Sequence, residues 1–182
     1  GGDVTITSAG AGRTTTSASI TTSNDVITFA SPTTLGGAVA LASTGGNVTF
    51  ADTLNGANTL LITAGAGNVS FTGVVGGNTP LGALRIVSAG NVTATTLSSA
   101  SFVQNAGTGT TTFGGAVITT AIAGVDVTNT TLAVNAAVTT GGDGVVTFTQ
   151  SGATTIATAG TIISGGDVTI TSAGAGRTTT SA

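Results

Sequence analysis

Few side chains in this sequence could take part in acid–base or nucleophilic chemistry. The charged residues are six Asp and three Arg, and the chain has no His, Cys, Lys, Glu or Tyr. Five of the six Asp stand at expected turns, four of them beside or near Gly, and Asp52 has no acidic companion close by. Polysaccharide-cleaving sites need clustered carboxylates, or an Asp with a basic partner. We therefore expect no catalytic residue and no cofactor, and we expect that the protein is not an enzyme.

Metal binding and N-glycosylation also receive little support. The segment GGDG at 141–144 is only faintly similar to calcium-binding nonapeptides, which place Asp at short fixed intervals. Here a repeat of about 20 residues supplies at most two carboxylates, so we expect no metal site. Four N-glycosylation tripeptides begin at Asn47, Asn68, Asn91 and Asn129. A turn Asn followed by an alternating strand produces that pattern without any sugar.

The strongest candidate for ligand contact is a row of hydroxyl side chains. A short motif of Gly with Asn or Asp, followed by alternating apolar and hydroxyl residues, recurs as GDVTIT at 2–7, GNVTF at 46–50 and GNVSFT at 67–72. Its outward position carries a hydroxyl in every copy: Thr5, Thr28, Thr49, Ser70, Thr93, Thr112, Thr128, Thr147 and Thr169. Thr is β-branched and suits a water-facing strand, which alone explains the row. A flat hydroxyl ladder could also bind glycan, ice or a neighbouring fibre.

Strands must present this row, because side chains alternate between the two faces of a strand. The apolar residues of the motif then point inward in two columns. The first column is Val4, Ile27, Val48, Val69, Val92, Thr111, Val127, Val146 and Val168. The second column contains the predicted core stack of Phe29, Phe50, Phe71, Phe113 and Phe148. The first three Phe are evenly spaced, which would place their rings on neighbouring coils about 4.8 Å apart.

An acidic or amide residue precedes most of these strands. The predicted turn ladder is Asp3, Asp25, Asn47, Asn68, Asn91, Asp126 and Asp167. Asn and Asp accept left-handed backbone geometry and bond to nearby amides, while the adjacent Gly tolerates positive φ. Stacked in register, these residues would form a ladder along one corner.

The short motif is the smaller of two nested repeats in the chain. It recurs at uneven steps of about 20 residues, which suits one coil of a parallel β-solenoid. The shortest step runs from Thr110 to Asp126, and the longest runs from Asn68 to Asn91. A second apolar segment follows each copy at about half a step, so we expect at least two strands in each coil.

The larger repeat is exact. The segment 1–18 recurs without change as 165–182, so 1–164 make up one long repeat and 165–182 begin the next. We therefore predict one continuous all-β domain over 1–182, a parallel β-solenoid with about 20 residues per coil. The long repeat would contain about eight such coils.

Composition excludes several other classes. A net charge of −3 with three Arg leaves no basic surface for nucleic acid. No apolar run reaches the roughly 18 residues of a membrane helix, so we expect no membrane insertion. The segment 1–20 lacks a signal peptide, so an export signal would lie elsewhere. Without Cys there is no disulfide framework. A mean hydropathy of +0.51 and evenly spread β-branched residues argue against disorder.

The coils GNVTF and GGDVTIT, the bias toward Gly, Thr, Ala and Asn, and the uneven coil length resemble the repeat regions of filamentous-haemagglutinin-type exoproteins and giant bacterial surface adhesins. The resemblance covers the whole chain. It implies a right-handed β-helical shaft, secreted by a Gram-negative-type cell and displayed at the surface or shed as a fibre. The N-terminal secretion domain of such proteins is not in this sequence.

We therefore expect a structural repeat of an extracellular fibre or adhesin stalk, in which each long repeat adds roughly 40 Å. Bare solenoid ends expose strand edges, so the expected partners are copies of the same protein, in tandem, end to end or side by side. The alternative is a carbohydrate-binding module that uses the hydroxyl row. Ice binding is less favoured because the steps are uneven, and a trimeric virion fibre would need registering aromatic or charged residues that the sequence lacks.

Overall fold

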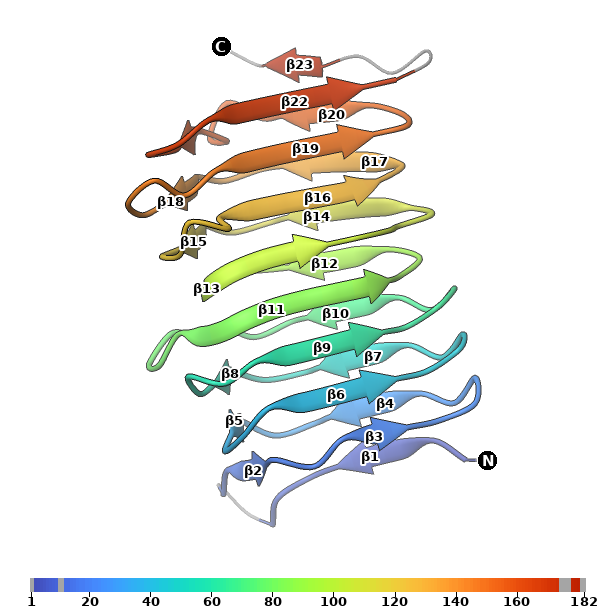
Figure 1. The fold of residues 1–182 in the computed structure, drawn as a ribbon. Helices are drawn as coiled ribbons and strands as arrows, with labels where there is room; N and C mark the ends of the chain where they lie inside the picture. The colour runs from blue at the N-terminus through green and yellow to red at the C-terminus, as the bar shows by residue number, and fades with distance from the viewer. Residues whose placement is uncertain (1, 10–11, 174–177, 181–182) are drawn as a thin grey trace.

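Every strand pair in the described part of the chain is parallel, and each strand pairs with strands about one coil before and after it. The structure is a computed structural model that describes residues 2–9, 12–173 and 178–180. These residues form strands and turns with no helix, and they wind upward as a right-handed coil (Figure 1). The predicted class, an all-β parallel solenoid, is confirmed.

Each coil has three sides, which follow one another along the chain as A, C and B. Side A is the nine-stranded sheet at the back of Figure 1. Its strands are β1 (Val4–Ile6), β4 (Ile27–Phe29), β7 (Val48–Phe50), β10 (Val69–Phe71), β12 (Val92–Ala94), β14 (Thr110–Phe113), β17 (Thr131–Val134), β20 (Thr154–Ile156) and β23 (Thr178–Thr180).

Side B is the front of the solenoid in Figure 1. Its strands are β3 (Ile20–Thr21), β6 (Val39–Ala42), β9 (Leu60–Thr63), β11 (Leu81–Ser88), the last part of β13 (Leu97–Gln104), β16 (Val125–Asn129), β19 (Val146–Gln150) and β22 (Val168–Ser172).

Side C is a short third side, in addition to the two strands per coil that the half-step spacing predicts. It starts with the separate sheet β2 (Thr14–Thr16), β5 (Thr33–Leu35) and β8 (Leu54–Asn55). Single bridges from Leu54 to Val75 and from Val75 to Leu97 carry it to the start of β13. It then continues through β15 (Val117–Thr119), β18 (Val138–Thr140) and β21 (Ile162–Ile163).

Backbone hydrogen bonds parallel to the axis join each coil to the next. The Val48 N–H donates to the Asn68 carbonyl at 2.9 Å, and the Val69 N–H donates to the Asn91 carbonyl at 2.9 Å. One register position on side A runs through Val4, Ile27, Val48, Val69, Val92, Thr111, Leu132, Thr154 and Thr178. All coils therefore stay in register although their lengths differ.

The lengths of the coils vary less than the motif spacing predicted. On side A the shortest coil runs from Val92 to Thr111, and the longest runs from Thr154 to Thr178. The shorter predicted step, from Thr110 to Asp126, is not a coil, because Thr110 lies on side A and Asp126 lies on side B. That step compared positions on different sides.

The core consists of apolar side chains that point inward from all three sides. The rings of Phe29 and Phe50 stack with centroids 4.7 Å apart, and those of Phe50 and Phe71 are 5.4 Å apart. Ala94 occupies the next position of this column, and above it Phe113 makes an edge contact with Phe102 of side B. Phe148 is buried but lies on side B between Val127 and Ile170, so its predicted place above Phe113 is wrong.

We predict that Phe50→Ala lowers the free energy of unfolding by about 3–5 kcal/mol, because it leaves a cavity between two stacked rings. Thermal and denaturant unfolding followed by circular dichroism would measure the loss. Ile122→Ala is the matched control, because the Ile122 side chain is 71% exposed. Equal destabilisation by the two variants would contradict the stacked core.

Candidate functional site

The first six residues of the predicted hydroxyl row lie side by side on side A. They occupy one register position on six consecutive strands: Thr5, Thr28, Thr49, Ser70, Thr93 and Thr112. Their side chains are half-buried or exposed, and inward residues flank them on each strand. Six successive coils therefore present a hydroxyl ladder to solvent.

The last three positions predicted for this row are wrong, because Thr128, Thr147 and Thr169 lie on side B. On side A the row continues through Ala133 and Thr155. The sequence motif itself moves from side A to side B after the sixth coil, and backbone register, not motif similarity, decides which residues become neighbours. The predicted inward columns change sides at the same point.

On side B, Thr128 and Thr147 are not neighbours, although they occupy the same position of the sequence motif. Thr147 stands between Asp126 and Thr169, whereas Thr128 is in register with Thr149. Thr128 and Thr147 are therefore in different columns, although their motifs look equivalent.

Three of the predicted turn residues form an amide ladder at the corner before side A. Asn47 Oδ1 accepts the Asn68 N–H at 2.8 Å, and Asn68 Oδ1 accepts the Asn91 N–H at 2.8 Å. Asn91 Oδ1 then accepts the Thr110 N–H at 2.8 Å. Each exposed Asn thus satisfies a backbone donor of the coil above it.

The four Asp of the predicted ladder do not extend it. Asp3 Oδ1 accepts the N–H of Val26, because Val26 and not Asp25 precedes β4 in register. Asp126 lies within β16 on side B, and Asp167 precedes β22 on the same side. Asp25 is displaced by the extra residue Val26 before β4. Asp126 and Asp167 are displaced because their motif copies lie on side B.

Glycine is needed at this corner for close stacking, not for the positive φ that we predicted. A Cβ on Gly46, Gly67 or Gly90 would collide with a backbone carbonyl of the coil below. None of the three has a positive φ, and among the described residues Asn24 is the only non-Gly residue that does. The Gly–Asn pair therefore brings coils close enough for the amide ladder.

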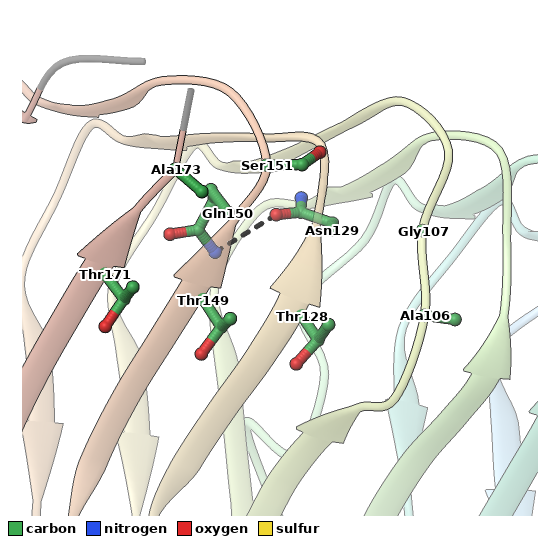
Figure 2. Close-up of a pocket in the computed structure, with 9 residues that line it drawn as sticks. All are labelled: Ala106, Gly107, Thr128, Asn129, Thr149, Gln150, Ser151, Thr171 and Ala173. Carbon is green, nitrogen blue, oxygen red and sulfur yellow. Dashed lines mark hydrogen bonds between the residues drawn. The ribbon is translucent and has the colours of Figure 1, made fainter. Parts of the chain in front are cut away.

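A groove of about 350 Å³ lies on side B toward the C-terminal end of the solenoid (Figure 2). It is lined by Ala106, Gly107, Thr128, Asn129, Thr149, Gln150, Ser151, Thr171 and Ala173. Thr128, Thr149 and Thr171 occupy one register position on β16, β19 and β22, and Figure 2 shows their hydroxyls pointing the same way. This second, shorter hydroxyl ladder borders the groove.

Buried amides form the wall of the groove above this ladder. Gln150 Nε2 donates to Asn129 Oδ1 at 3.1 Å and to the Val127 carbonyl at 3.0 Å (Figure 2). Gln150 Oε1 accepts the Thr154 hydroxyl at 2.7 Å. These amides are satisfied within the solenoid, so the groups available to a ligand are mainly the Thr hydroxyls.

Another buried amide lies beneath the floor of the groove. Gln104 Oε1 accepts the Thr111 hydroxyl at 2.6 Å, but its buried Nε2 has no partner. A Cβ on Gly107 would collide with this nitrogen, so the Gly107 backbone covers it. The floor of the groove is therefore formed by small residues and backbone. None of the residues that line the groove is titratable.

The described residues include no group of three or more His, Cys, Asp or Glu that could hold a metal ion. Over the same residues, no helix is long and apolar enough to cross a membrane. The arrangement can donate and accept hydrogen bonds through hydroxyls, and the lining of the groove offers no acid–base group.

No family model matches the chain, and neither curated proteins nor solved structures give a match. Function is therefore inferred from the geometry of the solenoid. Motif similarity does not reveal the groove, because it aligns the motifs at 125–130 and 144–149 two residues out of register and places Val127 beside Val146, whereas Val127 is in register with Phe148. The 21-residue spacing of Asn129 and Gln150, which end equivalent strands, was the signal that could have revealed it.

The environment of the Asp126 carboxyl shifts its pKa. Asp126 lies within β16 between Val103 and Thr147, and burial raises its pKa above the ordinary value of 3.8. The folded state therefore holds the proton more tightly than the unfolded state. Stability is lost as the pH rises from near 3.8 through the folded-state pKa.

We predict that Asp126→Asn raises the melting temperature at pH 7, because the variant no longer buries a charge, and that the gain shrinks toward pH 3. Calorimetry at both pH values would measure it. Asp143→Asn is the matched control at an exposed turn. A gain for Asp126→Asn that is equal at the two pH values would contradict the assigned cause.

Proposed function

We propose that the protein is a structural repeat of an extracellular fibre or adhesin stalk. The observation that carries this proposal is the unbroken parallel pairing from β1 to β23 around one continuous apolar core. Each coil contacts mainly the coils directly below and above it, so the shaft can lengthen by adding coils that make the same contacts. With a rise of about 4.8 Å per coil, length grows in proportion to the number of coils.

The surface also suits a passive shaft. The chain carries few charges, and much of side A shows hydroxyl and amide side chains that repeat from coil to coil. We assign the protein no catalytic step, since the groove is lined by hydroxyl, amide and small apolar side chains. The extracellular location is supported by the resemblance to repeats of filamentous-haemagglutinin type, which implies secretion.

We predict that chains of one, two and three joined long repeats form straight rods whose length grows by about 37 Å per repeat. The reason is that one long repeat corresponds to seven coils and two further sides, from Val4 on side A to Val168 on side B. Negative-stain electron microscopy and small-angle X-ray scattering would measure the lengths.

Beads joined by flexible linkers would contradict the shaft. Immunogold labelling of intact source cells, compared with permeabilised cells, provides the test of location. Label that appears only after permeabilisation would rule out a surface fibre.

Carbohydrate binding is the second candidate, and the groove on side B favours it over the hydroxyl row of side A. Three exposed Thr hydroxyls, about 4.8 Å apart from strand to strand, border a floor that includes Ala106 and Gly107. This combination can bond sugar hydroxyls and contact an apolar sugar face. The unequal coil lengths on side A disfavour the regular lattice that ice binding needs.

If the groove binds glycans, we predict that Thr149→Lys abolishes binding on a glycan array, because the long side chain fills the centre of the ladder. Thr49→Lys on side A is the matched control and should leave binding unchanged. Equal loss in both variants would place any binding outside the groove.

A further inference from the structure

The same sequence lies on two different sides of this solenoid. The segments 4–8 and 168–172 both read VTITS, but β1 lies on side A against β4, whereas β22 lies on side B against β19. The next shared segment, TTT, forms β2 on side C and β23 on side A. Both segments are therefore shifted by one side, in the same direction.

Specific contacts hold the second copy of VTITS on β19. Val168 is in register with Val146, and Ile170 is in register with Phe148 and packs against the core. The Ser172 hydroxyl lies 3.1 Å from that of Thr154. The edge of β19, together with Thr154, thus selects Val, Ile and Ser at alternating positions.

The first copy of VTITS carries the same side chains at the other end of the described solenoid. Within it, β1 pairs with β4 alone, so its opposite edge has no strand partner. Val4 and Ile6 are half-buried, whereas their register neighbours Ile27 and Phe29 are 0% and 1% exposed. The free edge of β1 therefore matches the surface that β19 offers to β22.

We propose that a second copy of this chain docks end to end by sharing one copy of this segment, so that side A of the second continues side B of the first. The inference rests on the proposed shaft function and adds the geometry of its junction. One VTITS strand then lies between β19 of the first chain and β4 of the second, with the register that each already has. The duplicate segment is released, and the exchange replaces its contacts by identical ones.

This junction differs from simple stacking, which would place side A on side A. Each junction turns the shaft by one side, so the pattern returns after three copies, about 110 Å along the fibre. The groove on side B would then face three directions in turn. Such a fibre presents the same surface all round its axis, although each unit carries it on one side.

Single cysteines test the junction in this chain of 182 residues, which has no Cys of its own. Thr147→Cys is mixed with Thr5→Cys, and Thr169→Cys with Thr28→Cys, and disulfide-linked dimers are measured after mild oxidation. If the first chain supplies the shared strand, Thr169 lies beside Thr28 of the second chain. If the second chain supplies it, its Thr5 lies beside Thr147 of the first chain. Either pair is then on neighbouring strands, about 4.8 Å apart and within disulfide range. Thr179→Cys mixed with Thr5→Cys is the matched control, because Thr179 is at the same register position on β23, the last strand of side A, and only stacking of side A on side A places it beside Thr5.

We expect linked dimers for at least one of the first two mixtures, at least fivefold above the control mixture. As a check on geometry, Thr147→Cys with Thr169→Cys in one chain must form an internal disulfide, since these residues are in register. Linkage in the Thr179 mixture alone would overturn the shifted junction and leave the shaft intact. No linkage in any mixture, with the internal disulfide formed, would overturn end-to-end sharing, whereas the shaft itself fails only if joined units do not form rods.

Discussion

Backbone hydrogen bonding between successive coils is the constraint on which the rest of this structure depends. Each inner strand both donates hydrogen bonds to and accepts them from the coils below and above it, so every coil must keep the register of its neighbours. Turns absorb the difference between the shortest and the longest coil, while the strand positions stay aligned. Because the pairing is parallel and continuous, equivalent residues of successive coils form columns along the axis.

These columns decide which residue types are tolerated. Asn repeats at one corner because each side chain satisfies a backbone donor one coil above, and Gly repeats beside it because a Cβ would meet the carbonyl below. Phe repeats where rings can stack. Where Ala94 interrupts that column, Phe102 from the opposite side of the same coil fills the core and packs against Phe113. Core volume is therefore balanced across sides within a coil as well as along a column.

The shaft and its ends follow from the same constraint. A coil that needs only a neighbour of matching register can lie against a coil of its own chain or of another copy. The repeated segment VTITS meets that requirement at both ends, but on different sides, because the long repeat is not a whole number of coils. The migration of the motif from side A to side B within the unit brings the second copy of the segment to side B.

The strands, the parallel solenoid, the approximate coil length and the stacking of Phe29, Phe50 and Phe71 follow from the amino-acid sequence alone, because alternation and even spacing are local properties of the chain. Six residues of the hydroxyl row on side A and three Asn of the amide ladder could be predicted in the same way. The folded chain was needed to show which motif copies share a side beyond Phe113, where the groove forms, and why Gly stands beside Asn. The physical reason is that these features depend on register between coils, and turns of different length change that register without altering the motif.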